Sequence, residues 1–236
     1  MIFENIKGVI KTSLIDFPGK IAAVLFVGGC NFRCPYCYNV DVVLTPSQLP
    51  TVSQEELFKF FSSRKGWLDG VVVSGGEPTI YPDLPQLLGW IKEFGYAVKL
   101  DTNGSDPHML QSLIDGRLVD YVALDVKAPL DSSRYQVFSQ GCDGVEKIRA
   151  AAEILMSSNI SYEFRTTVVP GLVSREDVLQ IAQELRGAQR YYLQQFRPEP
   201  RLIDPGLVSV RPYPLEFLYE LRKEVSPYFK ICKVRA

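Results

Sequence analysis

Long apolar runs, a strong charge bias and a recognisable leader segment are all missing from this sequence of 236 residues. No stretch approaches the roughly 18 consecutive apolar residues that would span a bilayer, so we expect no membrane helix. The opening residues, Met1–Lys7, lack the apolar core and cleavage site of a secretory signal, and we therefore expect a cytoplasmic protein. The formal net charge of −1 gives no electrostatic reason to expect binding to nucleic acid or to a membrane surface.

Histidine is almost absent as well, and the cysteines do not form a disulfide set. His108 is the single histidine, and the five cysteines are Cys30, Cys34, Cys37, Cys142 and Cys232. An odd number of cysteines, with three of them crowded together, points to metal binding or redox chemistry in a reducing compartment. Cys142 and Cys232 lack the paired spacing of a second metal cluster, so we expect at most one.

The secondary-structure pattern alternates short apolar segments with amphipathic ones. We expect strands at residues 22–27, 70–74, 96–100, 121–124, 162–169 and 191–195. We expect helices at residues 53–63, 84–94, 107–115, 145–157, 175–185 and 215–225, the first starting in a capping box of Ser53 and Glu56. Such alternation predicts a parallel sheet with βαβ crossovers. Six units are fewer than a closed barrel needs, so we predict an α/β fold that forms an open, partial (β/α)6 barrel.

The chain shows no internal repeat, low-complexity segment or linker that would divide it. We therefore expect one domain over residues 1–236, with residues 1–20 as an extension that leads into the first barrel strand. Within that extension, Lys11–Lys20 is expected to form a short hairpin or loop.

Polar motifs follow or lie in the expected strands. They are Gly28-Gly29-Cys30, Gly75-Gly76-Glu77-Pro78, Asp101-Thr102-Asn103-Gly104, Asp125-Val126-Lys127 and, within the fifth strand, Arg165. Parallel α/β sheets place their ligand sites at the carboxyl ends of the strands. The sequence therefore predicts a ligand site at that edge of the sheet.

The spacing of Cys30, Cys34 and Cys37 allows three interpretations. In a helix, the three side chains would share one buried face, but Pro35 would cost such a helix about 3 kcal/mol. A structural zinc ion requires four ligands, and no fourth is evident. Thiolates are the usual ligands of iron–sulfur clusters, and three of them leave one iron of a four-iron cluster open to a ligand.

The segment from Gly29 to Asn39, which reads GCNFRCPYCYN, resembles the signature loop of the radical S-adenosylmethionine (SAM) superfamily. The resemblance implies that Cys30, Cys34 and Cys37 hold one [4Fe-4S] cluster, whose open iron binds SAM. It further implies that an electron from the cluster cleaves SAM to a 5′-deoxyadenosyl radical, which abstracts hydrogen from a substrate. The residue before the last cysteine, Tyr36, is then expected to contact adenine.

Gly75, Gly76 and Glu77 resemble the GGE motif of the same family. The resemblance implies that they contact the methionine ammonium group of SAM. Arg165 resembles the family arginine that pairs with the SAM carboxylate, a role suited to its planar donors. The alternatives are an ordinary strand-to-loop turn for the glycines and a surface ion pair for Arg165.

Two further motifs resemble those of the activating enzymes of glycyl-radical enzymes. The resemblance implies SAM contacts for Asp101, Asn103, Asp125 and Lys127, and a monovalent cation at Asp101, Thr102, Asp125 and Val126. Carboxylates at neighbouring strand ends repel one another unless a cation or a lysine intervenes. The alternative is an Asx turn at Asp101 and a solvated ion pair between Asp125 and Lys127. Gln194 and Arg197, after the sixth strand, are candidate contacts at the rim of the site.

The segment from Thr12 to Ile21 resembles the opening of the activating proteins of anaerobic ribonucleoside-triphosphate reductase. The resemblance implies a glycyl-radical protein as the substrate and an electron donor such as flavodoxin or ferredoxin. The chain departs from the family at Tyr38, where a histidine is common. One alternative is a radical enzyme that acts on a small molecule, such as a purine-like precursor. Another is a metal-binding protein without enzymatic activity.

Overall fold

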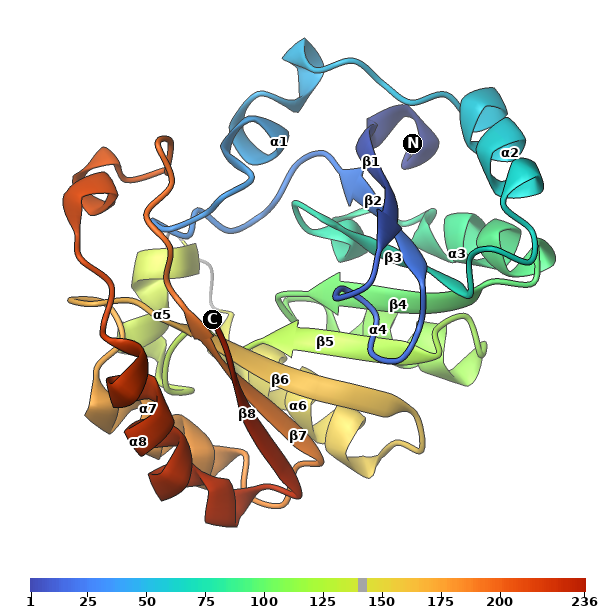
Figure 1. The fold of residues 1–236 in the computed structure, drawn as a ribbon. Coiled ribbons are helices and arrows are strands. Elements are labelled where there is room, and N and C mark those ends of the chain that lie inside the picture. The colour runs from blue at the N-terminus through green and yellow to red at the C-terminus, as the bar shows by residue number, and fades with distance from the viewer. Residues whose placement is uncertain (140–143) are drawn as a thin grey trace. The chain divides into compact units, whose positions relative to one another are not determined.

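A single open sheet organises the computed structural model, which describes residues 1–139 and 144–236 (Figure 1). Its strands are β1 (Ile6–Ser13), β2 (Ala22–Val27), β3 (Gly70–Gly75), β4 (Ala97–Thr102), β5 (Tyr121–Asp125), β6 (Ser161–Val168), β7 (Arg190–Gln195) and β8 (Ile231–Arg235). They follow one another in chain order from β1 to β8. β1 pairs with β2 antiparallel, whereas the pairs β2–β3, β3–β4, β6–β7 and β7–β8 are parallel. The predicted open α/β fold is confirmed.

Two strands and two helices were not predicted. The helices are α1 (Val40–Leu44), α2 (Gln54–Ser63), α3 (Leu84–Glu93), α4 (Pro107–Asp115), α5 (Ser132–Ser139), α6 (Val145–Ser157), α7 (Arg175–Glu184) and α8 (Leu215–Val225). The additions are α1, α5 and the outermost strands β1 and β8. The segment Lys11–Lys20 contains the end of β1 and the turn toward β2, so the expected hairpin is present.

Contacts divide the chain into two compact units. Unit 1 comprises Met1–Asn31, Asn39–Thr102 and His108–Val122, and unit 2 comprises Phe32–Tyr38, Asn103–Pro107 and Ala123–Ala236. The expectation of one domain over the whole chain stays a prediction. Cys142, for which we expected no role in a second cluster, lies outside the described residues.

The core of unit 1 contains apolar strands and an aromatic cluster. β2 and β3 pair in parallel register from Ala22–Gly70 to Val27–Gly75, and most of their side chains are buried, as expected for a parallel sheet covered on both faces. Phe61 of α2 meets Trp90 of α3 and Tyr96, which holds the two helices together. The capping box that starts α2 is present.

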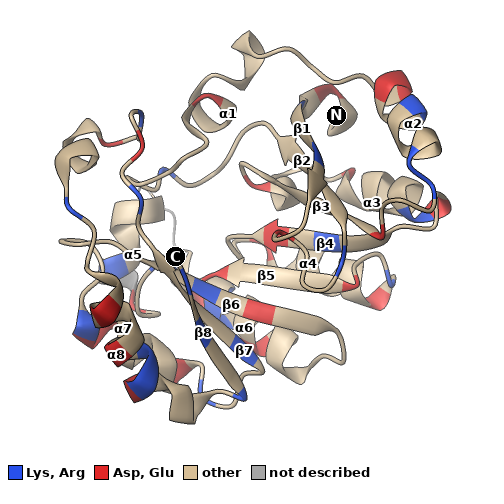
Figure 2. Ribbon diagram, viewed as in Figure 1, with Lys and Arg blue, Asp and Glu red and all other residues tan. Residues whose placement is uncertain are grey.

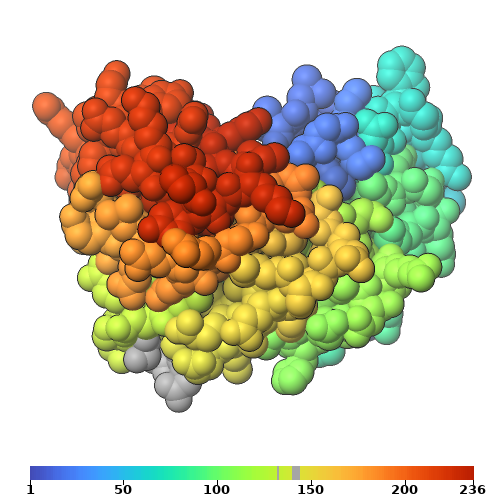
Figure 3. All heavy atoms as spheres, turned by 90° about the horizontal axis from the view of Figure 1, so that it is seen from below, coloured from blue at the N-terminus to red at the C-terminus, as the bar shows by residue number. Residues whose placement is uncertain are grey.

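Unit 2 contains the pairs β6–β7 and β7–β8, both parallel, together with α7 and α8. The two helices lie side by side in Figure 1, and their outward surfaces carry charges of both signs in Figure 2. Figure 3 shows the C-terminal segment, coloured red, as a continuous surface beside the orange residues. A fully buried carboxylate, Glu163, accepts two hydrogen bonds from Arg235, of 2.8 and 2.9 Å, and so ties β8 to β6.

No helix in the described part of the chain is both long enough and apolar enough to cross a membrane.

Candidate active site

The glycines after β3 are required by the way the neighbouring strand end packs. A Cβ atom on Gly76 would overlap the carbonyl oxygen of Gly29, and one on Gly75 would overlap the backbone of Val27. Gly75 also has a φ of 109°, a conformation that only glycine adopts readily. The Gly75 carbonyl accepts a 2.8 Å hydrogen bond from the side chain of Asn39. The loops after β2 and β3 therefore lie in direct backbone contact.

Glu77 is a buried carboxylate whose partners lie inside unit 1. Glu77 is only 1% exposed to solvent. Its Oε1 atom accepts hydrogen bonds from the Thr79 amide at 3.1 Å, the Thr79 hydroxyl at 2.6 Å and the Thr102 hydroxyl at 2.7 Å. Thr102, which was a candidate cation ligand, thus links the end of β4 to the loop after β3. Contact of Glu77 or Thr102 with a cofactor or cation stays a prediction.

Asp101, at the end of β4, is held by residues that sequence reasoning did not select. The Lys99 ammonium forms an ion pair with Asp101, and the Ser74 hydroxyl donates a 3.2 Å hydrogen bond to it. Lys99 is 1% exposed. The sequence feature that could have identified Lys99 is a lysine among the apolar residues of an expected buried strand, because a buried lysine is rare unless an acid pairs with it.

Asp125, at the end of β5, joins two cations within unit 2. Arg165 Nε donates to Asp125 Oδ1 at 2.7 Å, and Lys127 Nζ lies 3.7 Å from Asp125 Oδ2. The Asp125 side chain is 34% exposed, whereas those of Arg165 and Lys127 are 11% and 10% exposed. The structure thus brings together three predicted site residues, with the carboxylate the most open of the three.

The backbone near this ion-pair group is fixed by its own hydrogen bonds. The Val126 amide donates to the Arg165 carbonyl at 2.8 Å, and the Val126 carbonyl accepts from the Thr166 hydroxyl at 2.7 Å. The Lys127 amide donates to the Tyr135 hydroxyl at 3.0 Å. Tyr135 was not selected from the sequence, since one buried tyrosine on a short helix gives no pattern.

Lys127 is held in its charged form. Burial alone would lower its pKa, but the negative charges of a Cys34 thiolate and of Asp125 raise that pKa well above its usual value. Conversely, burial raises the pKa of the Cys34 thiol to about 11, and Lys127 partly offsets that rise. Lys127 is therefore a cation that favours negative charge on both neighbours.

The cysteine loop turns tightly at its second half. The Cys37 amide donates to the Cys34 carbonyl at 3.0 Å, so these two cysteines share one turn of unit 2. Cys30 follows β2 in unit 1. None of the three forms a disulfide bond, and all three are partly exposed.

Tyr36 packs inside unit 2, where it is 6% exposed. Its ring meets Phe138 of α5 edge-on, with centroids 6.0 Å apart. The Arg33 amide donates to the Phe138 carbonyl at 2.8 Å. The short helix α5 therefore supports the loop that carries Cys34 and Cys37.

Three other predicted residues occupy different settings. Asn103 makes an Asx turn, because its Oδ1 accepts from the Ser105 amide at 2.9 Å. Gln194 is partly exposed and pairs in the sheet with Arg235 of β8. Arg197 is exposed, and its amide donates to the hydroxyl of Tyr38 at 2.9 Å. Tyr38 thus connects the cysteine loop to the segment after β7, although its sequence position marked only a departure from the family pattern.

Comparisons with known proteins agree over most of the chain. The sequence profile of the Radical SAM superfamily matches residues 24–185. A candidate glycyl-radical enzyme activating enzyme of Methanocaldococcus jannaschii is 38% identical over 200 residues, which cover 82% of this chain and 80% of that protein. The pyruvate formate-lyase-activating enzyme of Streptococcus mutans is 30% identical over 237 residues, covering 91% of this chain and 86% of that protein.

Among solved structures, the Streptococcus suis protein SuiB bound to S-adenosylmethionine superposes with a TM-score of 0.64 at 14% identity. The match covers 87% of this chain but only 48% of SuiB, so the chain spans about half the length of that structure. At this identity the similarity concerns the fold alone.

The cofactors of the superfamily are a [4Fe-4S] cluster and SAM. The donor chemistry of this chain fits the cluster, because its cysteine loop carries three cysteines outside any disulfide bond and thiolates are the usual cluster ligands. The profile match covers more than half of the chain. The chain therefore belongs to the radical SAM superfamily, and it is an enzyme that uses these two cofactors.

Proposed function

We propose that this chain activates a glycyl-radical enzyme, by abstracting hydrogen from a glycine of that partner protein. The observation that carries the proposal is similarity to two activating enzymes over 80% and 86% of their own lengths. The segment from Thr12 to Ile21, which resembles the opening of such activators, supports an anaerobic ribonucleotide reductase as the partner. The proposal includes a cytoplasmic location and a flavodoxin or ferredoxin as electron donor.

In this proposal Cys30, Cys34 and Cys37 hold the cluster. When bound, the reduced cluster supplies the electron that cleaves SAM. The turn between Cys34 and Cys37 supports the assignment, since it brings two ligands into one short loop. Lys127 favours the thiolate form of Cys34, which is the form that binds metal.

The group formed by Asp125, Lys127 and Arg165 is proposed to orient the methionine part of SAM. A guanidinium has five N–H donors, more than one carboxylate can use. The bond from Arg165 Nε to Asp125 fixes the plane of the guanidinium. An arginine so fixed can meet the SAM carboxylate with two parallel hydrogen bonds.

Asp125, which is 34% exposed at its side chain, can accept a hydrogen bond from the SAM ammonium group. Tyr36 is proposed to contact adenine through its backbone, because its ring is packed against Phe138. The same proposal includes cofactor contacts by Gly75, Gly76, Glu77 and Asn103. It also includes a monovalent cation at Asp101, Thr102, Asp125 and Val126. Gln194 and Arg197 are proposed as contacts at the rim of the site.

The first test is SAM cleavage by anaerobically reconstituted protein with dithionite, read as release of 5′-deoxyadenosine. We expect cleavage by the wild type, and loss of both cluster absorbance and cleavage in Cys34→Ala. Cys232→Ala is the matched control, because Cys232 is a partly exposed free thiol on β8 and outside the loop. Equal cleavage in the wild type and Cys34→Ala would exclude the proposed ligand set.

The second test concerns the partner. Reconstituted protein, SAM and an anaerobic ribonucleotide reductase should give the doublet of a glycyl radical in electron paramagnetic resonance. The signal should disappear when the partner's radical glycine is replaced by alanine. SAM cleavage without a glycyl signal on any glycyl-radical protein would favour a small-molecule substrate instead.

A further inference from the structure

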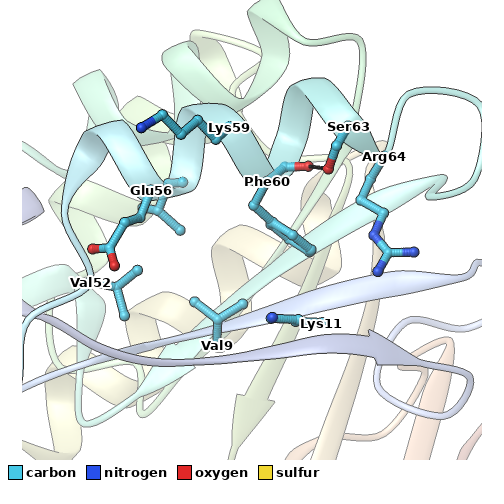
Figure 4. Close-up of a pocket in the computed structure, with 9 residues that line it drawn as sticks. Val9, Lys11, Val52, Glu56, Lys59, Phe60, Ser63 and Arg64 are labelled. Carbon is cyan, nitrogen blue, oxygen red and sulfur yellow. Dashed lines mark hydrogen bonds between the residues drawn. The ribbon is translucent and has the colours of Figure 1, made fainter.

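A pocket of about 600 Å³ lies between α2 and β1, wholly within unit 1 (Figure 4). Its size falls in the range of roughly 300–1,000 Å³ that is usual for small-molecule sites. Its lining contains none of the residues assigned above to the cluster or to SAM. The pocket is therefore not explained by binding of the cluster or of SAM.

Two cations at one end of this pocket have no acidic partner. Figure 4 shows the Lys11 ammonium and the Arg64 guanidinium on the side of the pocket next to Phe60. In residues 1–139 and 144–236, no ion pair joins either of them to a carboxylate. Lys11 lies on β1 and Arg64 directly follows α2, so the two cations approach this end of the pocket from opposite walls. An anion between them would be stabilised by both.

The two acids in the first turn of α2 interact with residues of the same helix and its N-cap. Glu56 lines the pocket, but its carboxylate accepts hydrogen bonds from the Ser53 amide at 2.8 Å and the Ser53 hydroxyl at 2.7 Å. The neighbouring Glu55 pairs with Lys59 at 2.6 Å. Glu56 keeps its negative charge, since the Ser53 donors are neutral, but neither acid forms an ion pair with Lys11 or Arg64 in the described residues. An anionic ligand is therefore expected at the end of the pocket that carries Lys11 and Arg64.

Part of the pocket wall is apolar and includes an aromatic ring, although Lys59 and Ser63 also line the pocket. In Figure 4, Val9 of β1 and Val52 both lie on the side of Phe60 that faces away from Arg64. The Arg64 guanidinium lies 5.9 Å from the centroid of the Phe60 ring. A flat apolar group would find the ring and both valines beside the two cations.

The outer edge of β1, which borders the pocket, is partly occupied and so is not fully available to a β-strand of another protein. The Val52 amide donates a 2.8 Å hydrogen bond to the Ile6 carbonyl, so the segment before α2 takes a position on the outer edge of β1. Strand addition requires those backbone groups to be available. This arrangement favours a compact ligand.

We infer that the pocket between α2 and β1 binds a small organic anion, with its phosphate or carboxylate between Lys11 and Arg64 and its planar apolar body against Phe60. The two anionic groups share the same recognition by two cations. The proposal is independent of the activating function, because it involves none of the cofactor residues.

Isothermal titration calorimetry of the reconstituted full chain with phenyl phosphate tests the proposal. Inorganic phosphate and phenol, titrated separately, carry the anion alone and the ring alone, and both should bind more weakly than phenyl phosphate. Benzoate, run in parallel, decides between phosphate and carboxylate. No heat of binding from either phenyl phosphate or benzoate at millimolar concentration would overturn the proposal.

Variants locate the site. Lys11→Ala and Arg64→Ala should each weaken binding of phenyl phosphate about tenfold, the effect expected for loss of a charge-assisted contact. Lys65→Ala is the matched control, because Lys65 is an exposed cation next to Arg64 that lies over Phe94 and outside the pocket lining. Equal losses in Lys65→Ala and Arg64→Ala would mean diffuse charge attraction and would overturn the site.

Folding and activity controls complete the test. Arg64→Lys keeps the charge and should retain most of the affinity, which separates a binding defect from a folding defect. Each variant should cleave SAM at the wild-type rate. In hydrogen exchange, phenyl phosphate should protect amides of Gln54–Ser63 and Ile6–Ser13 in the wild type and not in Arg64→Ala. Protection in both proteins would contradict the assignment.

Discussion

Two acids at strand ends, Glu77 in unit 1 and Asp125 in unit 2, are used in opposite ways. Glu77 is 1% exposed, and one of its oxygens accepts three hydrogen bonds from Thr79 and Thr102. Asp125 is 34% exposed at its side chain and is bound to cations, Arg165 and Lys127. One carboxylate joins two loops through hydrogen bonds, and the other is partly exposed beside two cations.

The comparison shows that acids at equivalent positions, after parallel strands, can have different structural surroundings. Both acids follow parallel strands, where ligand sites occur. Their partners differ, since Glu77 accepts from neutral hydroxyl and amide donors, whereas Asp125 pairs with two cations. Asp101 resembles Asp125 in having a cationic partner, but that partner, Lys99, is completely buried. Each of the two aspartates thus has a cationic partner within its own unit.

The largest expected effect comes from removing Glu77. Glu77→Ala leaves the donors of Thr79 and Thr102 buried without this acceptor, and should lower the free energy of unfolding by about 3 kcal/mol. Glu77→Gln retains an Oε1 acceptor and should lose only about 1 kcal/mol. Anaerobic urea denaturation measures both. Unchanged stability in Glu77→Ala would remove the distinction between the two acids.

Arg165→Ala should mainly affect the cofactor. Loss of a charge-assisted pair with a carboxylate typically costs at least about 2 kcal/mol, so we expect SAM to bind at least about thirtyfold more weakly. Equilibrium dialysis with labelled SAM measures the change. Arg165→Lys cannot form the same paired hydrogen bonds and should recover only part of the affinity. Wild-type affinity for SAM in Arg165→Ala would show that Arg165 pairs with Asp125 and does not contact SAM.

Asp125→Asn should separate function from stability. Asparagine keeps an Oδ1 acceptor for Arg165 Nε at a side chain that is 34% exposed, so the free energy of unfolding should change by less than about 1 kcal/mol. SAM cleavage should fall about tenfold, because the amide neither holds Arg165 as firmly nor carries the charge that an ammonium group prefers. Paired urea and cleavage assays test this. A large stability loss with normal cleavage would place Asp125 in the same class as Glu77.

The smallest effect concerns pH. The pKa of Lys127 is raised, so its charged form contributes stability fully below the unfolded pKa and loses it only as pH rises through the higher folded pKa. SAM affinity should therefore show no titration by Lys127 between about pH 6 and about pH 9. Lys127→His should introduce a dependence near about pH 6.5. A wild-type step that disappears in Lys127→His would show that Lys127 titrates in this range.

The parallel strands and long helices were predictable because each carries its own signal. Ala22–Val27 is uniformly apolar, and Ser53 with Glu56 marks the start of α2. The outermost strands were missed, because β1 and β8 are half-exposed and mix lysine with apolar residues. Edge strands lack the continuous apolar run that burial on both faces produces.

The site was predictable as a set of residues, but their contacts were not. The order of motifs along the chain located Asp125 and Arg165, which do pair. Lys99 and Tyr135 act through tertiary contacts that leave no spacing pattern. The glycines after β3 were expected to serve a ligand, whereas the structure gives them a packing reason as well, the contact of Gly76 with Gly29.

The order of the strands, which follows the chain from β1 to β8, has a consequence for synthesis on the ribosome. Each strand that leaves the exit tunnel finds its neighbour already made, and no strand must wait for a later insertion between two others. The sheet can therefore lengthen at one growing edge as translation proceeds, because its pairing needs only the segment just completed. A translational pause would leave a shorter sheet with one unpaired edge rather than a gap within it.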